Sequence, residues 1–163
     1  MNFKNQFEKY DFLKQASEIS KSCGAELYIV GGFVRDTILN RSSDEIDFLV
    51  IGNGPEFARK FANSLGVKEL SIYKNFGTAH FNYDGLALEF VGARKESYSS
   101  DSRKPVVAGG TFEDDIKRRD FTINTLAVSL NENNYGELID YFNGREDIQN
   151  KILRTPLDPE QTF

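Results

Sequence analysis

Residues 26–36 form the stretch ELYIVGGFVRD, from which the rest of the architecture can be worked out. Residues 26–30 are rich in aromatic and β-branched side chains, as is typical of a strand. The pair Gly31-Gly32 follows at once, and apolar residues continue beyond it to about Leu39. We therefore predict a strand over 26–30, a tight turn at the glycines and a helix over 33–39.

Strand and helix signals alternate on both sides of this unit. Upstream, apolar residues recur near helical spacing over 5–21. Downstream, a helix is expected over 55–65, and a turn signal at 83–85 separates two of the predicted strands. These strands are expected at 47–51, 68–73, 78–83 and 86–93. The order of elements predicts a mixed α+β fold.

The composition changes in the last third of the chain. Residues 95–110 are mostly Ser, Asp, Lys, Arg, Pro and Gly, which indicates a mobile loop within the domain. Beyond this loop we expect helices at 112–118, 122–127 and 145–149, and a strand pair at 126–130 and 137–140. A single domain over 1–163 accounts for all of these elements.

Composition narrows the class of protein. The 163 residues are 39% hydrophobic, enough for one core, and their net charge of −5 argues against a protein that coats nucleic acid. The single cysteine, Cys23, excludes an internal disulfide and a multi-cysteine zinc site. The N-terminus lacks the apolar segment of a signal peptide, and no apolar run is long enough to span a membrane. We therefore expect a cytoplasmic location.

The diglycine turn is the first candidate binding site. Glycines between a strand and a helix let a ligand approach the backbone, where the first helical N–H groups favour an anion. Arg35, one turn into the helix, adds a guanidinium suited to a phosphate. A plain strand-to-helix turn, with Arg35 paired to a surface carboxylate, explains the same residues. The spacing does not match G-x-G-x-x-G, so a dinucleotide-binding fold is not favoured.

The second candidate site is acidic and lies around the next predicted strand. Side chains at alternate positions share a face, so Glu45 and Asp47 project together, whereas Asp44 lies on the face of Ile46 and Phe48. Neighbouring carboxylates repel each other, a cost that a bound cation removes. Because the ligands are oxygens and no histidine is near, Mg²⁺ is the favoured ion.

Glu89 is a candidate third ligand. It is the single acid in the apolar run over 86–91. It either joins Glu45 and Asp47 at the metal or occupies the solvent face of an antiparallel strand. The residues alone leave both interpretations open.

The third candidate site is the stretch KRRDFTIN, residues 117–124. Two arginines precede Asp120, and Asn124 follows it by one helical turn, an arrangement that suits a phosphate clamp beside a sugar-facing polar pair. A structural interpretation is also open, in which Asp120 and Thr122 cap helices and the arginines offset the acids at 113–115.

In combination, these motifs resemble the head domain of the class II tRNA nucleotidyltransferases, the CCA-adding enzymes and the bacterial poly(A) polymerases that share this head. The resemblance extends from about Leu27 to Thr155. The matching motifs, in chain order, are Gly31–Asp36 (family G-G-x-V-R-D), Glu45–Asp47 (metal-binding D-x-D), Glu89–Arg94 (E-[FVI]-x-x-x-R) and Arg118–Asn124 (R-R-D-[FL]-T-[IM]-N).

The resemblance implies a nucleotidyltransferase fold like the palm of the DNA polymerase beta superfamily, with helices packed on one side of a small mixed sheet and acids on its open face. It also implies template-independent transfer of CMP and AMP from CTP and ATP to the 3′ end of tRNA. Two Mg²⁺ ions would activate the RNA 3′-hydroxyl and stabilise the leaving pyrophosphate, so that positioning and charge neutralisation carry the rate.

The resemblance further implies a role for each matching residue. Glu45 and Asp47 would bind the metals, and Glu89 would be the third catalytic acid. The nucleotide site would comprise the other motif residues: Gly31, Gly32 and Arg35 at the triphosphate, Arg119 at the nucleotide, and Asp120 and Asn124 at the sugar.

The sequence departs from the family in two ways. Glu45 stands where the family has aspartate, and the extra methylene moves a metal-binding oxygen by about one bond length. Three functions therefore stay open: CCA addition, poly(A) addition to other RNA, and nucleotide binding with weakened or lost catalysis.

The second departure is length. In the family, neck, body and tail domains select CTP and ATP and bind tRNA, and these domains do not follow within the sequence. We expect a head-domain fragment that binds nucleoside triphosphates with little base preference.

Overall fold

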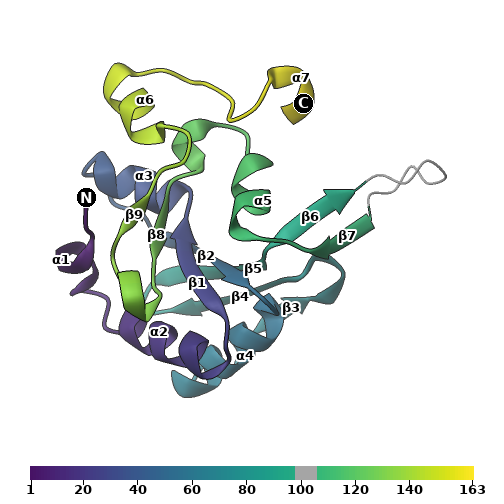
Figure 1. Cartoon of the computed structure of the whole chain (residues 1–163). Coiled ribbons are helices and arrows are strands. Elements are labelled where there is room, and N and C mark those ends of the chain that lie inside the picture. The colour runs from purple at the N-terminus through teal and green to yellow at the C-terminus, as the bar shows by residue number, and fades with distance from the viewer. Residues whose placement is uncertain (98–105) are drawn as a thin grey trace.

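The structure of the chain is a computed structural model that describes residues 1–97 and 106–163 (Figure 1). A seven-stranded sheet runs through the molecule, and it is mixed, because β2 pairs antiparallel with β1 and parallel with β5. In their order across the sheet the strands are β3 (Ser71–Tyr73), β4 (Thr78–Tyr83), β5 (Leu86–Gly92), β2 (Glu45–Ile51), β1 (Glu26–Val30), β8 (Ala127–Ser129) and β9 (Leu138–Ile139).

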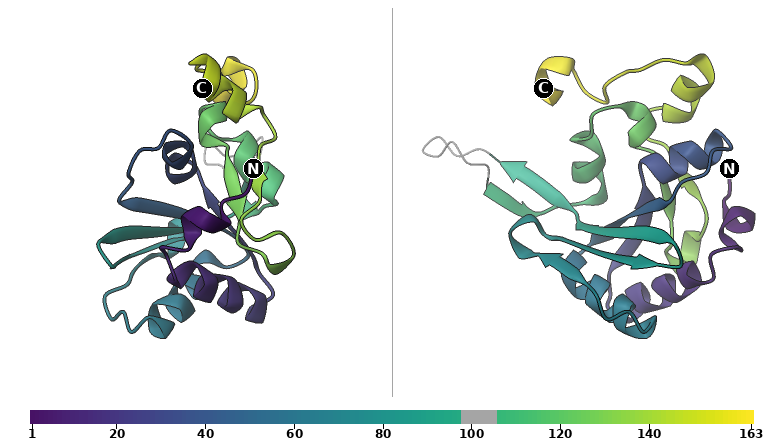
Figure 2. Two further views of the ribbon diagram at one scale, coloured as in Figure 1. Left: turned by 90° about the vertical axis from the view of Figure 1, so that its left-hand side faces the viewer. Right: turned by 180° about the vertical axis from the view of Figure 1, so that it is seen from behind.

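Helices surround this sheet on more than one side (Figures 1 and 2). The α-helices are α1 (Lys4–Phe7), α2 (Phe12–Ser22), α3 (Gly32–Ile38), α4 (Gly54–Ser64), α5 (Phe112–Lys117), α6 (Gly144–Asn150) and α7 (Pro159–Thr162). In the described ranges, 3₁₀ turns connect other elements: η1 (Lys74–Phe76), η2 (Thr122–Asn124) and η3 (Glu132–Asn134). The expected mixed α+β fold is confirmed.

The main core lies between the sheet and helices α2 and α4, which lie side by side across one face (Figure 1). Aromatic rings from the strands and from α4 dominate it: Phe48, Phe57, Phe61, Phe81 and Phe90, all at most 2% exposed. The rings of Phe48 and Phe90 stack with their centroids 4.9 Å apart. Because aromatic side chains bury a large area each, these rings contribute a large share of the hydrophobic stabilisation on this side of the sheet.

A smaller apolar cluster lies on the opposite face of the sheet. There α5 packs Phe112 and Ile116 against Tyr28, Val30 and Leu49. This contact covers only part of the second face. The acidic residues of β2 and β5 lie on the same side of the sheet and are partly or fully exposed.

The N-terminal helix predicted over 5–21 is two helices in the structure. The chain turns between α1 and α2, where the backbone N–H of Tyr10 bonds to the carbonyl oxygen of Phe7. Phe7 and Phe12 both belong to the main core, where Phe7 contacts Tyr135 and Phe12 contacts Tyr83. The apolar periodicity continues across this turn and therefore overestimated the length of the helix.

Other boundaries also differ from the predictions. Strand β2 begins at Glu45 instead of residue 47, so both acids belong to the paired strand. The helix predicted over 122–127 is only the turn η2, because the backbone must then extend as β8 to pair with β1. Strand β3 begins at Ser71, three residues later than predicted.

The segment predicted as a loop, 95–110, is bounded by strands. Residues of β6 (Arg94–Ser97) pair antiparallel with those of β7 (Val106–Gly109), and this ribbon extends away from the sheet (Figure 1). The polar composition did not reveal this pairing. Backbone hydrogen bonds hold the ribbon together, and they depend little on which side chains the strands carry. The remainder of the predicted loop, 98–105, lies outside the described residues, and its mobility stays a prediction.

Among the described residues, none of the helices is long and apolar enough to cross a membrane.

We predict that Phe90→Ala lowers the free energy of unfolding by about 3–5 kcal/mol, because it opens a cavity between two stacked rings. Phe90 is fully buried, and Phe48 and Phe81 flank it with ring centroids at 4.9 and 5.2 Å. Urea denaturation followed by circular dichroism measures the change. The matched control is Phe76→Ala, since Phe76 is 64% exposed and should cost about 0.5 kcal/mol or less. Equal losses in the two variants would contradict this account of the core.

Candidate active site

Two neighbouring strands bring three carboxylates together on the open face of the sheet. Glu45 and Asp47 alternate along β2, and the parallel register of β2 with β5 places Asp47 directly beside Glu89. Carboxylate oxygens of the three residues lie within 4.8 Å of one another. Of the two interpretations of Glu89, the structure therefore favours the one that joins it to the other acids. This group of Glu45, Asp47 and Glu89 is called the acid triad below.

The alternation predicted from the sequence separates the triad from the core. Ile46 and Phe48 are fully buried on the helix-covered face, as predicted, and Asp44 is exposed. Asp44 lies just before β2 begins and is not part of the triad.

The triad is electrostatically strained. Burial, together with the negative charges of Glu45 and Glu89, raises the pKa of Asp47 from 3.8 to about 6. The nearby Arg119 guanidinium opposes this rise. A site made only of carboxylate oxygens, with one member that resists ionisation, fits a hard divalent cation such as Mg²⁺, which would offset the repulsion.

The diglycine turn brings the backbone against this triad. Gly31 has φ +74°, a conformation that favours glycine, and its N–H donates to the carbonyl oxygen of Leu126. A Cβ at position 31 would lie 3.5 Å from Nη1 of Arg119 and 3.8 Å from Oδ2 of Asp47. The first and second sequence motifs thus meet at Gly31, where the backbone passes beside the acids.

Arg35 connects the first motif to the third. Its Nε donates to Oδ1 of Asp36 at 2.9 Å, and its Nη1 donates to Oδ1 of Asn124 at 2.8 Å. Asn124 in turn donates from Nδ2 to Oδ1 of Asp120 at 3.0 Å. Arg35 is therefore paired with a neighbouring carboxylate, as the structural interpretation expected, but it also joins two motifs that lie 89 positions apart.

Arg119 is held in place by Asp115, one of the three acids that the structural interpretation expected the arginines to offset. Asp115, on α5, is fully buried, and its Oδ2 accepts hydrogen bonds from Nε and Nη2 of Arg119 at 3.2 and 3.0 Å. Its Oδ1 accepts from Nε and Nη2 of Arg118 at 3.1 and 2.6 Å. This arrangement, in which Asp115 accepts from both arginines, is called the buried fork below. It leaves Nη1 of Arg119 near Gly31. The sequence did not single out Asp115 among these acids, although its i, i+3 and i, i+4 spacing from the two arginines on a helix favours the contact.

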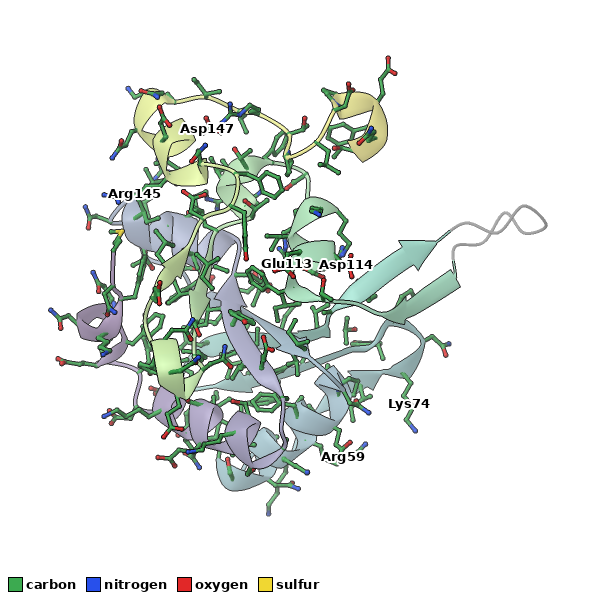
Figure 3. The ribbon with its side chains drawn as sticks, viewed as in Figure 1. Arg59, Lys74, Glu113, Asp114, Arg145 and Asp147 are labelled. Carbon is green, nitrogen blue, oxygen red and sulfur yellow. The ribbon has the colours of Figure 1, made fainter. Side chains whose placement is uncertain are left out.

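A second buried acid anchors η2, which follows Arg119 and carries Asn124. Asp147 on α6 (labelled in Figure 3) is 3% exposed and accepts a hydrogen bond from the Thr122 hydroxyl at 2.5 Å. Arg154 donates to the same carboxylate from Nε and Nη2. Sequence analysis missed this contact, because residues 122, 147 and 154 share no local pattern.

The start of α5 is capped by its own side chains. Thr111 accepts from the backbone N–H of Asp114, whose carboxylate accepts from the backbone N–H of Thr111. Glu113 and Asp114 lie together at this first turn (Figure 3), where acids interact favourably with the helix dipole. The acids at 113–115 are therefore not equivalent: two stabilise the helix start, and Asp115 holds the arginines.

The raised pKa of Asp47 predicts how the acid affects stability. The folded chain binds this proton more tightly than the unfolded chain, so the contribution to stability is lost as pH rises through about 6. With a chelator present at about pH 7.5, Asp47→Asn should increase the free energy of unfolding by at most about 3 kcal/mol, and the increase should fall to about 0.5 kcal/mol near pH 4. Urea denaturation of both proteins at the two pH values measures it.

Two observations control this experiment. Asp44→Asn removes an exposed acid outside the triad and should change stability little at either pH. Added Mg²⁺ should stabilise the unmodified chain and not Asp47→Asn, because a ligand stabilises only the state that binds it. A gain in Asp47→Asn of equal size at both pH values would show that ionisation of Asp47 is not the cause.

The buried fork gives a second prediction. Asp115→Asn removes the charge that faces two guanidinium groups, and we expect it to lower the free energy of unfolding by about 3 kcal/mol. Glu113→Gln, on the same helix but exposed, should cost about 0.5 kcal/mol or less. Both are measured by urea denaturation. A loss in Asp115→Asn no larger than that of the control would mean that the fork contributes little.

Comparison with known proteins places this geometry in a family. A family model described as the poly A polymerase head domain matches residues 27–154. The A-adding tRNA nucleotidyltransferase of Aquifex aeolicus is 44% identical over 127 residues, which are 78% of this chain and 15% of that protein. The CCA-adding enzyme of Lactobacillus helveticus is 37% identical over 147 residues, which are 88% of this chain and 34% of that protein.

Solved structures agree with the sequence relatives. A tRNA nucleotidyltransferase complexed with a primer tRNA and an incoming ATP analog is 39% identical, with a TM-score of 0.76 over 87% of this chain and 39% of that chain. An apo form of a CCA-adding enzyme is 30% identical, with a TM-score of 0.84 over 96% of this chain and 38% of that one. The chain thus spans well under half the length of these proteins. From the match over residues 27–154 and the shared fold, we conclude that it belongs to the poly(A) polymerase head domain family.

Proposed function

We propose that the chain is the nucleotidyl-transferring head of a tRNA nucleotidyltransferase, which adds CMP and AMP from CTP and ATP to the 3′-hydroxyl of tRNA. The observation that carries the proposal is the acid triad, which lies against the glycine turn and Arg119. Relatives named A-adding and CC-adding tRNA nucleotidyltransferases support the reaction class and the RNA substrate, and a relative named CCA-adding enzyme supports the reaction.

Magnesium is the cofactor that we assign to this site. Glu45 and Asp47 would hold two Mg²⁺ ions, with Glu89 as the third acid beside them. When bound, these ions would activate the attacking 3′-hydroxyl and neutralise charge on the leaving pyrophosphate. The raised pKa of Asp47 is consistent with the assignment, because burial and the negative charges of Glu45 and Glu89 both disfavour its ionised form and a bound cation would offset both effects.

The remaining residues bind and orient the nucleotide. Gly31 and Gly32 carry no side chain, so a triphosphate can approach their backbone. A Cβ at Gly31 would lie 3.5 Å from Nη1 of Arg119 and one at Gly32 would lie 3.5 Å from Nη2 of Arg35, so both arginines would supply positive charge to phosphates at the turn. Asp120 and Asn124, hydrogen-bonded to each other, form the polar surface for the sugar. The side chains therefore act by positioning and by charge, which suits phosphoryl transfer.

Glu45 bears on whether the site is active. Its side chain is longer than the aspartate of the family motif, yet its carboxylate reaches within 4.8 Å of those of Asp47 and Glu89. This supports an active site over a nucleotide-binding domain that has lost catalysis. Poly(A) addition to other RNA uses the same chemistry at the head, and the substrate arms of the experiment below separate it.

The proposal is tested by incubating the protein with Mg²⁺, each labelled nucleoside triphosphate, and either tRNA lacking its 3′ end or an unrelated RNA. We expect CMP and AMP to be incorporated into the tRNA, and Glu45→Ala and Asp47→Asn each to reduce the rate at least about a hundredfold. Glu45→Asp should retain activity, and Asp44→Ala, outside the triad, should match the unmodified protein.

Each contrary outcome excludes one part of the proposal. Incorporation of AMP alone, into both RNAs, would identify a poly(A) polymerase head. Unchanged activity in both Glu45→Ala and Glu45→Asp would show that Glu45 does not bind metal. The chain alone could fail to incorporate any nucleotide. If it still fails after the body domains of a tRNA nucleotidyltransferase are joined to it, the catalytic assignment is wrong.

A further inference from the structure

A cavity of about 750 Å³ lies at the other end of the strands that carry the acid triad. It opens where β2 and β5 end, between the start of α4, the turn η1 and the base of β6. None of the triad residues lines it. Arg94 lies five residues beyond Glu89 along the chain, which in extended backbone is a separation of about 17 Å. The cavity is therefore separate from the candidate active site.

Positive charge gathers around this cavity. Arg59, Lys74 and Arg94 line it, and none of the three has an ion-pair partner in the part of the chain that the structure describes. The fourth cation, Lys60, is 3.4 Å from Glu56 and is thus compensated. Figure 3 shows Arg59 and Lys74 on the same side of the molecule. In a chain with a net charge of −5, this local excess favours an anionic ligand.

Arg94 lines this cavity with a donor that no described residue satisfies. Its Nε is buried and has no hydrogen-bond acceptor among the described residues. A buried donor without an acceptor costs free energy, and the cost is larger for a charged group. Protein atoms cover Nε, so a phosphate would bind this guanidinium through its outer N–H groups, whose geometry matches that of phosphate oxygens.

Aromatic side chains are exposed beside these cations. Phe76 lines the cavity and is 64% exposed, and Tyr73, three residues earlier, is 54% exposed. Exposed rings next to a basic groove are typical of proteins that bind single-stranded nucleic acid, since unpaired bases stack on the rings. A simple inorganic anion would leave these rings without a role.

We propose that this cavity binds a single-stranded segment of RNA, with phosphates on Arg59, Lys74 and Arg94 and a base stacked on Phe76. The inference rests on the proposed function for its class of ligand, RNA, but places the contact on a surface other than the candidate active site. A free nucleoside triphosphate offers similar phosphate and base chemistry, and an acidic peptide offers only the charge. The experiment separates these ligands.

The test measures binding of a labelled single-stranded uridine RNA to the whole chain by fluorescence anisotropy. Arg59→Glu/Lys74→Glu should weaken binding at least about tenfold and reduce the salt slope by about 1.4, because each phosphate that is no longer neutralised lowers it by about 0.7. Phe76→Ala should weaken binding about fivefold or more. The control Lys9→Glu/Lys14→Glu makes the same charge change outside the cavity lining and should stay within about twofold.

The outcomes separate this inference from the proposed function. The cavity variants should bind CTP with Mg²⁺ as tightly as the unmodified chain does. Asp47→Asn should lose CTP binding and retain RNA binding. Equal RNA binding by Arg59→Glu/Lys74→Glu and its control would overturn the inference, whatever CTP does. The inference would also be overturned if polyglutamate or free CTP competed as effectively as unlabelled RNA, because the cavity would then recognise charge alone or a mononucleotide. Loss of RNA binding in the cavity variants supports it even if CTP never binds.

Discussion

Three mutually repelling carboxylates are held side by side by the hydrogen-bond register between β2 and β5. The parallel pairing sets Asp47 beside Glu89, and alternation along β2 adds Glu45 on the same face. Burial and these neighbouring charges raise the pKa of Asp47 to about 6. The sheet therefore carries a local electrostatic cost at the point where the proposed reaction needs divalent cations, and such a cost is common at functional sites.

The same register also builds the core. Phe48 follows Asp47 and Phe90 follows Glu89, so the pair that is next in register points to the opposite face. There the two rings stack at 4.9 Å beneath α4. A slip of β5 against β2 would separate the acids and the rings at once. Burial of the aromatic core thus stabilises an arrangement that charge repulsion alone would disfavour.

Positive charge is distributed unequally along these strands. At the end near Gly31, Arg119 is fixed by the buried Asp115, so its direction is set before any ligand arrives. At the other end, the guanidinium of Arg94 has a buried donor without an acceptor among the described residues. The first arrangement suits a nucleotide that must be oriented for reaction. The second suits a polymer that needs only to be held, which is the difference between the proposed active site and the proposed RNA contact.

The sequence by itself determined the features that depend on residues close together in the chain. These are the strand, turn and helix around Gly31, the separation of Glu45 and Asp47 from Phe48, and the motifs that resemble the family. Only the tertiary structure decided that Glu89 joins the acids, that Asp115 holds Arg119 and Asp147 holds Thr122, and that α1 and α2 are separate helices. Those contacts join residues that are distant in sequence or depend on the direction of side chains. Strand order, register and packing set them, and these follow from the free energy of the whole core, which no local pattern encodes.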